Sequence, residues 1–121
     1  MNAVTPLAEH GYKNPGMRTT RDAEYEVFAR VTRMLRQAPE RADNRDTIAA
    51  VSKNTELWTL LAFDLAEPGN ALPEDTKAGL LSLAGFQIRH GRAVLAGDAA
   101  TAPLIDINMN VMRGLRGEVR A

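Results

Sequence analysis

The chain has 121 residues and a mass of 13.2 kDa, the size of one domain that can bury a core without disulfides or a structural metal. It contains no cysteine, which excludes a thiol nucleophile, a thiolate zinc site and an iron–sulfur cluster. Fifteen basic residues balance fifteen acidic ones, so the composition offers no basic arm for nucleic acid. No stretch is apolar enough for a signal peptide or a membrane span, and we expect a cytoplasmic protein.

The choice of apolar residues favours helices, because alanine and leucine far outnumber valine and isoleucine. Residues 1–18 contain glycine, asparagine and proline without an apolar repeat, which predicts a flexible N-terminal segment. A helical domain is predicted over residues 19–121. Its first helix begins near Thr20 and ends before Pro39. The apolar side of this helix consists of Val27, Val31, Met34 and Ala38.

A second helix is predicted between a capping residue, Asp43 or Asn44, and a turn at 67–70. One face repeats at steps of three and four residues and comprises Ile48, Val51, Thr55, Trp58, Ala62 and Leu65. Four further apolar residues widen this face: Leu57, Leu60, Leu61 and Phe63. A helix that is apolar most of the way round must be covered on several sides, so this face belongs either to the core of the domain or to a groove for a partner.

A third helix is predicted with Pro73 in its first position and Gly97 at its end. Its predicted buried side holds Leu80, Leu83, Ala84, Ile88 and Leu95. Glycine is a poor helix former, so we expect this helix to bend or break near Gly91. A fourth helix follows a cap at Asp98 or Thr101 and has one apolar side, with Leu104, Asn108, Val111 and Leu115. Four helices with short connections predict an all-α fold, an antiparallel four-helix bundle or a close variant of one.

Few residues suggest catalysis. The chain has no glycine-rich phosphate loop, no H-E-x-x-H motif and only two histidines, so we expect no metal, no cofactor and no enzymatic activity. Asp64 interrupts an apolar run, and a hydrogen bond to the turn at 68–72 is favoured over a role as a catalytic base. Asn108 lies on an apolar stripe, where an amide bonded to neighbouring backbone groups is favoured over a role in recognition.

Methionines and basic residues offer other contacts. Three methionines either fill the core or line a surface that accepts a partner's helix: Met34, Met109 and Met112. Basic residues gather near the ends of the third and fourth helices: Arg89, His90, Arg92, Arg113, Arg116 and Arg120. Cations at these positions compensate the helix dipole. Contact with RNA phosphates is the alternative, and the balanced charge argues against it.

Three blocks of the chain carry a family resemblance. The most specific reads Leu57-Trp58-x-x-Leu61-x-x-Asp64-Leu65-Ala66-x-Pro68-x-Asn70-x-Leu72-Pro73. The others are Leu80-Leu81-Ser82-Leu83 and Ile107-Asn108-x-x-Val111-x-x-Gly114-Leu115. Together they resemble the FlaF family of alphaproteobacterial flagellar regulators, over about Thr20 to Leu115. The chain departs from the family pattern in the glycines of the third helix and at Met109.

The resemblance implies a small cytoplasmic protein that binds flagellin as an export chaperone and couples flagellin synthesis to assembly. It also implies FlbT, a regulator of flagellin translation, as a second partner, and no membrane association. The alternative is a post-transcriptional regulator that contacts flagellin mRNA itself.

Two sets of residues are expected to matter for this function. Partner binding is expected at Trp58, Leu61, Phe63, Met109 and Met112. Structural roles are expected for Asp64, Asn70, Pro73 and Asn108.

Overall fold

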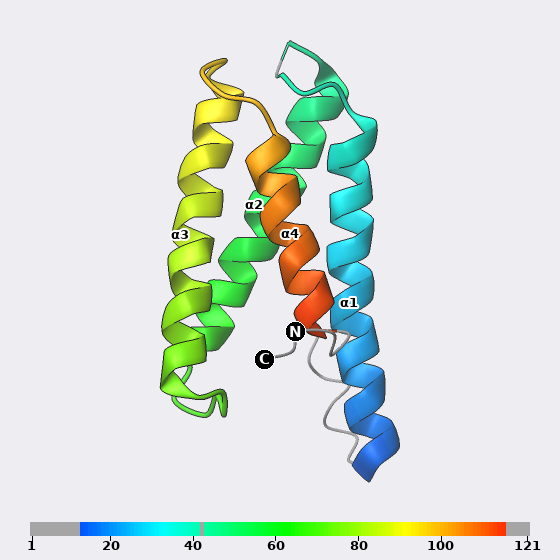
Figure 1. Cartoon of the computed structure of the whole chain (residues 1–121), viewed down its shortest axis with the longest axis vertical. Coiled ribbons are helices and arrows are strands. Elements are labelled where there is room, and N and C mark those ends of the chain that lie inside the picture. Colours follow the sequence, from blue (N-terminus) through cyan, green and yellow to red (C-terminus); the bar gives the residue numbers. More distant parts are fainter. Residues whose placement is uncertain (1–12, 42, 116–121) are drawn as a thin grey trace.

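The computed structural model describes residues 13–41 and 43–115, with side chains from Glu24 onward, as four helices (Figure 1). They are α1 (Lys13–Gln37), α2 (Arg45–Ala66), α3 (Glu74–Leu95) and α4 (Ala102–Leu115). Successive helices run in opposite directions and pack against each other, and α4 returns to pack against α1. The described residues contain no strand. The predicted all-α antiparallel bundle is confirmed.

The structure corrects the start of the first helix. α1 begins at Lys13 rather than near Thr20, so residues 13–18, predicted to be flexible, have helical backbone. Pro15 lies in the first turn of α1, where the N–H that proline lacks is not needed for a helical hydrogen bond, so proline does not exclude a helix there. Residues 1–12, the rest of the predicted flexible segment, lie outside the described residues.

Two predicted helix ends are built from the expected residues. Asn44 caps α2, because its side-chain oxygen accepts a hydrogen bond from the Asp46 N–H at 2.7 Å. Gly97, with a φ of 86°, ends α3 in a left-handed conformation that glycine adopts without strain. The N–H groups of Gly97 and Asp98 then donate to carbonyls in the last turn of α3, which is the pattern of a Schellman motif.

The core consists of two apolar clusters stacked along the bundle. One contains Leu35, Ala50, Val51, Val94 and Leu104. The other contains Phe28, Trp58 and Ala84. In the second cluster the Trp58 ring meets Phe28 edge to face, with ring centroids 5.6 Å apart. Because every helix contributes to these clusters, the bundle is held together by burial of apolar surface from all four.

The buried faces of α2 and α3 match the predicted ones in part, since Val51, Trp58, Leu65 and Ala84 are buried, and differ at other positions. Ile48 and Leu95, predicted to be buried, are 44% and 43% exposed. Their neighbours Thr47 and Val94 are buried instead. The prediction centred each stripe on large apolar residues, whereas the helices turn polar Asn54 and Gln87 inward.

The third helix does not break at Gly91, contrary to the prediction. α3 runs without interruption from Glu74 to Leu95, and Gly91 is buried against α2. A Cβ atom at Gly91 would lie 3.0 Å from Thr55 Oγ1 and 3.4 Å from Val51 Cγ1. This glycine therefore allows the close approach of α2 and α3, the pair of helices with the most extensive contact.

Candidate functional site

The centre of the bundle holds a network of four buried polar side chains. Trp58 Nε1 donates to Asn108 Oδ1 at 2.9 Å, and Asn108 Nδ2 donates to Asn54 Oδ1 at 2.8 Å. Asn54 Nδ2 in turn donates to Gln87 Oε1 at 2.7 Å. None of these residues is exposed. The network joins α2, α3 and α4, and it links α2 directly to α4 across the bundle.

Gln87 closes this network from α3. Its Nε2 donates to the Leu104 carbonyl oxygen at 3.2 Å and to Asn108 Oδ1 at 3.3 Å. Each buried amide thus has partners for its polar atoms, which is the condition for a stable polar core. Asn108 has the structural role expected, although its side chain bonds to other side chains rather than to backbone.

Asn54 and Gln87 were not singled out from the sequence. The signal was present in their spacing: Asn54 lies three residues after Val51 and four before Trp58. Gln87 similarly lies three residues after Ala84. A polar residue at such a position on an apolar stripe predicts a buried hydrogen-bonded group when a partner of the same kind lies on a neighbouring helix.

The structure corrects the assignment of Trp58 to partner binding. Its side chain is fully buried, packs on Phe28 and donates to Asn108. An indole with no exposed surface offers nothing to a partner, so Trp58 belongs to the core.

The other predicted structural residues build the connection between α2 and α3. Asn70 Nδ2 donates to the Asp64 carbonyl oxygen at 3.2 Å and to Asp64 Oδ2 at 3.4 Å. Asn70 Oδ1 accepts from the Leu72 N–H at 3.1 Å, and Pro73 is the capping residue just before α3. The predicted hydrogen bond between Asp64 and this turn is confirmed.

The basic cluster at the end of α3 is partly engaged within the bundle. His90 Nε2 donates to the Ala100 carbonyl oxygen at 2.9 Å, and its ring stacks on Phe86 at a centroid distance of 5.1 Å. Arg89 and Arg92 on either side are exposed. On α4, Arg113 Nη1 donates to Asn110 Oδ1 at 2.6 Å. Arg116 and Arg120 lie outside the described residues.

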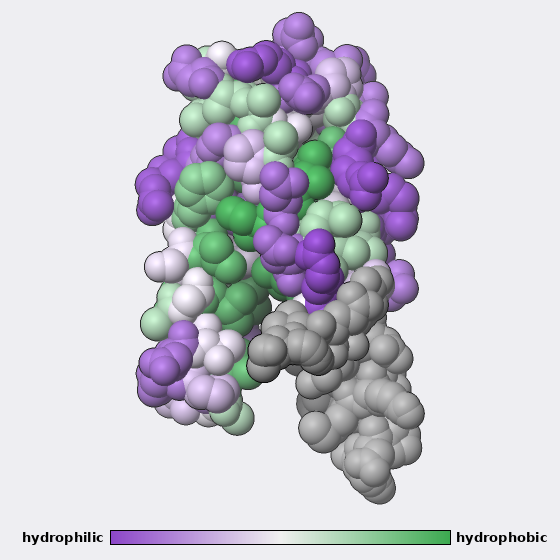
Figure 2. Space-filling model, viewed as in Figure 1, coloured by the Kyte–Doolittle hydropathy of each residue, from purple (hydrophilic) through white to green (hydrophobic). Residues whose placement is uncertain are grey.

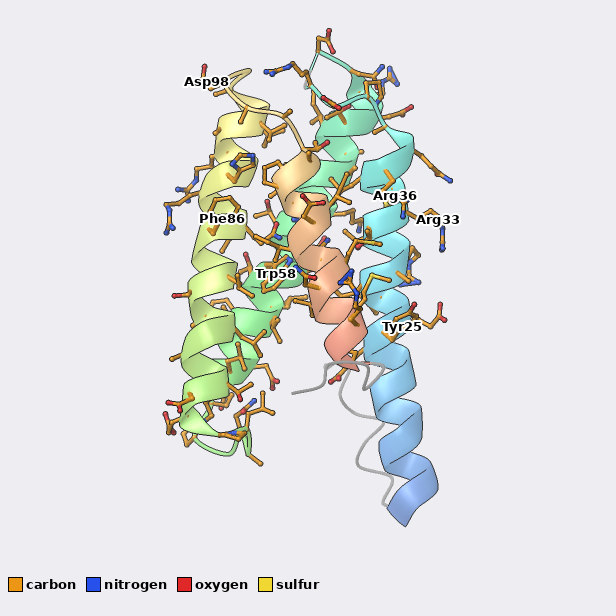
Figure 3. The ribbon with its side chains drawn as sticks, viewed as in Figure 1. Tyr25, Arg33, Arg36, Trp58, Phe86 and Asp98 are labelled. Atoms are coloured by element: carbon orange, nitrogen blue, oxygen red, sulfur yellow. The ribbon has the colours of Figure 1, made fainter. Side chains whose placement is uncertain are left out.

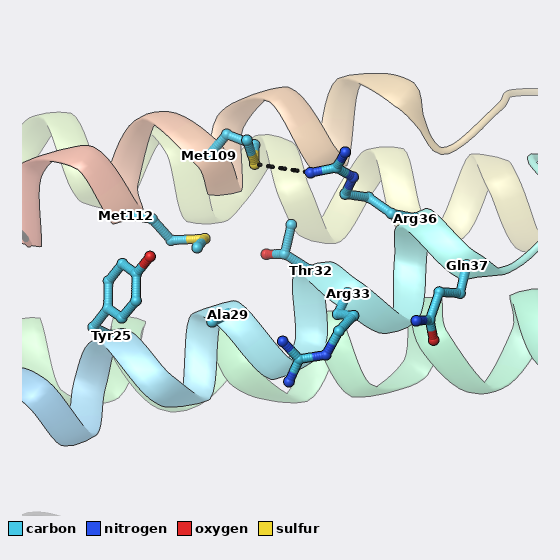
Figure 4. Close-up of a pocket in the computed structure, with 8 residues that line it drawn as sticks. All are labelled: Tyr25, Ala29, Thr32, Arg33, Arg36, Gln37, Met109 and Met112. Carbon is cyan, nitrogen blue, oxygen red and sulfur yellow. Dashed lines mark hydrogen bonds between the residues drawn. The ribbon is translucent and has the colours of Figure 1, made fainter.

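An open groove runs between α1 and α4 (Figure 4). Its volume is about 540 Å³, and its lining residues are Tyr25, Ala29, Thr32, Arg33, Arg36, Gln37, Met109 and Met112. The two methionines, both half-buried, form its α4 wall. Two of the five residues expected to bind a partner therefore lie together in one depression of the surface.

Three side chains of this groove, Thr32, Arg33 and Arg36, lack a strong polar partner among the described residues. Arg36 Nη1 contacts the Met109 thioether sulfur at 3.9 Å, a weak acceptor. No carboxylate among the described residues forms an ion pair with Arg33 or Arg36. Thr32 is only 2% exposed, and its Oγ1 has no hydrogen-bond partner. Figure 3 shows Tyr25, Arg33 and Arg36 spaced along α1, with Trp58 in the interior.

The remaining predicted contact residues, Leu61 and Phe63, lie on α2 and do not line this groove. Phe63 is 67% exposed, and nearby Leu60 is 61% exposed. Leu61, by contrast, is half-buried against the core. More apolar surface lies between α3 and α4, where Figure 2 shows hydrophobic side chains gathered on one face. Half-buried Leu83, Ile107 and Val111 come from these two helices.

The described helices include none with the length and apolar composition that crossing a bilayer requires. No curated protein and no solved structure is significantly similar to the chain. The family model for the flagellar protein FlaF matches residues 9–115, a span that includes all four helices from α1 to α4. The chain therefore belongs to the FlaF family of flagellar proteins.

Proposed function

We propose that this protein binds flagellin in the cytoplasm as an export chaperone and thereby couples flagellin synthesis to assembly. Its membership of the FlaF family supports a flagellar role. The observation that carries the finer proposal is the apolar surface left uncovered on the bundle. Large apolar residues that are at least 40% exposed include Ile48, Leu60, Phe63, Leu72, Leu81 and Leu95.

Exposed apolar side chains of this kind suit the chemistry of unassembled flagellin. The terminal segments of flagellin are amphipathic and associate readily, so they need cover before export. A helical bundle can supply that cover by burying the apolar side of a partner's helix, without any reaction. Methionines in the groove between α1 and α4 add adaptable contacts, because the thioether side chain packs against varied shapes.

The FlaF resemblance also implies FlbT as a second partner, and we include FlbT in the proposal. Its support is the family membership alone. A pull-down in which tagged protein is offered purified FlbT, with and without flagellin, distinguishes a ternary complex from competition for one surface.

Direct contact with flagellin mRNA is the alternative function. Exposed Arg89 and Arg92 would supply phosphate contacts on α3, and Arg113 would supply one on α4. Two features weigh against it: His90 is engaged with the Ala100 carbonyl, and the chain carries no net charge.

The decisive experiment is isothermal titration of the purified protein with monomeric full-length flagellin. We expect a dissociation constant in the micromolar range or below. Absence of binding at micromolar concentrations would contradict the chaperone role. In a parallel filter-binding assay, salt-dependent retention of flagellin mRNA that is lost in an Arg113→Gln/Arg116→Gln variant would favour the alternative.

A further inference from the structure

The groove between α1 and α4 has the length and direction of a helix-binding site. Its α1 wall extends from Tyr25 to Gln37, and twelve residues of helix rise about 18 Å. The lining positions on α1 are four, three and four residues apart at Tyr25, Ala29, Thr32 and Arg36, so they form one face of the helix. A partner helix of about three turns would fill this length.

The groove also has a definite charge. Arg33 and Arg36 lie one helical turn apart on its edge and are both exposed. The only polar contact of Arg36 with a described residue is the Met109 sulfur, and neither guanidinium has a carboxylate partner among the described residues. An acidic group on the occupant would meet two cations that nothing in the described chain neutralises.

Thr32 provides a second, independent indication that the groove takes a ligand. Its hydroxyl is buried in the wall of the groove and makes no hydrogen bond, a state that costs free energy in the isolated protein. The neighbouring Met112 side chain is flexible and half-buried, so it can move aside at small cost. A polar group of an incoming helix would then satisfy the hydroxyl.

We propose that this groove is the docking site for an amphipathic helix of flagellin that carries carboxylates about one turn apart. This proposal rests on the proposed function. The carboxylates pair with Arg33 and Arg36, and the apolar side of the helix contacts Met109 and Met112. The close approach that the docking needs is possible at Ala29, the small residue in the α1 wall.

The test compares two double variants in the full-length protein by titration with monomeric flagellin. The groove variant is Arg33→Gln/Arg36→Gln. Its matched control is Arg89→Gln/Arg92→Gln, which removes two exposed arginines of the same spacing from α3. We expect affinity to fall at least about tenfold in the groove variant and less than about twofold in the control. Circular dichroism should show both variants folded, because all four residues are exposed.

A third variant, Thr32→Val, separates docking from fold stability. Replacing an unpartnered buried hydroxyl by a methyl group should raise the midpoint of thermal unfolding by about 3 °C. The same change should weaken flagellin binding about threefold or more. A purely structural threonine would give the first effect without the second, and that result would count against the proposal.

The location can be read directly from methyl NMR of the labelled methionines. Flagellin should shift the signals of Met109 and Met112, whereas Met34, which packs against the core cluster, should stay unchanged. Shifts confined to other methionines would overturn the docking site.

The outcomes distinguish the two proposals. If the unaltered protein does not bind flagellin, the proposed function and this docking site both fail. If it binds but the groove variant binds equally well, or the control variant is weakened as much, only the docking site fails. Sedimentation of the protein alone tests whether a second copy of the chain occupies the groove. Self-association that the groove variant abolishes would assign the groove to that second copy and overturn the proposal.

Discussion

Asn108 is the side chain on which most of the buried polar contacts converge. It accepts from Trp58 Nε1 and Gln87 Nε2 and donates to Asn54 Oδ1. Such an arrangement is stable only when complete, because each group left without a partner keeps its desolvation cost. The network therefore acts mainly by fixing the alignment of α2, α3 and α4, rather than by adding favourable free energy of folding.

We predict that Asn108→Leu lowers the free energy of unfolding by about 3 kcal/mol or more, because it leaves the indole N–H and the Asn54 oxygen buried without their partner. Urea unfolding followed by fluorescence measures this, since Trp58 is the only tryptophan and is fully buried. The control is Asn110→Leu on the exposed side of the same helix, which should change stability by less than about 0.5 kcal/mol. Equal changes in the free energy of unfolding of the two variants would mean that the buried network matters no more to stability than an exposed position.

Among the helices, two of the three glycines of α3, Gly79 and Gly91, have opposite surroundings. A Cβ at Gly91 would press on Thr55 Oγ1 at 3.0 Å, whereas a Cβ at Gly79 would meet nothing within 4 Å. Replacing glycine by alanine inside a helix gains up to about 1 kcal/mol from propensity. Alanine substitutions at these two positions therefore distinguish the effect of helix propensity on stability from the effect of packing, within one helix.

We predict that Gly79→Ala stabilises the protein by about 0.5–1 kcal/mol, as expected for an exposed helix position. Gly91→Ala should instead destabilise it by about 1 kcal/mol, because the strain against α2 outweighs the gain in propensity. Thermal unfolding of the two variants in parallel gives the comparison. A stabilised Gly91→Ala variant would show that α2 and α3 can separate slightly without loss.

The number of helices and most of their ends could be predicted from the sequence, because Asn44, Gly97 and the prolines mark them through local chemistry. The start of α1 was missed, since residues 13–18 contain asparagine, proline and glycine and no apolar repeat, although Pro15 lies in a first turn, where proline is compatible with a helix. The inward positions of Asn54 and Gln87 were missed for a different reason. The spacing of Asn54 and Gln87 puts each on an apolar stripe, but their burial also needs polar partners on the neighbouring helices, and a pattern along one helix does not contain that information.

The same distinction applies to the candidate site: some of its residues are predictable from their own chemistry, and others depend on how the helices pack. Met109 and Met112 are predicted as contact residues from their chemistry, and both line the groove. Thr32, Arg33 and Arg36 are not among the predicted residues, because their place in the groove depends on which side of α1 faces α4. Trp58 was assigned to the surface since a wide apolar face on one helix suits a core and a groove equally well.

For the whole molecule, the balance of charge separates the two functions considered. Fifteen basic and fifteen acidic residues give no net charge to steer a polyanion towards the protein. The groove proposed to dock flagellin is lined by two arginines and by apolar side chains that include Met109 and Met112. By contrast, a protein that contacts six or more RNA phosphates loses affinity roughly a thousandfold when the salt concentration rises modestly.

We therefore predict that flagellin affinity falls by less than about tenfold between 50 and 500 mM NaCl, since salt weakens only the exposed charge pairs and leaves apolar contact intact. A titration series at four salt concentrations measures the slope. The Arg33→Gln/Arg36→Gln variant serves as the control, and its residual binding should depend still less on salt. A steep loss of flagellin binding in the unaltered protein would mean that charge, and not burial of apolar surface, holds the complex together.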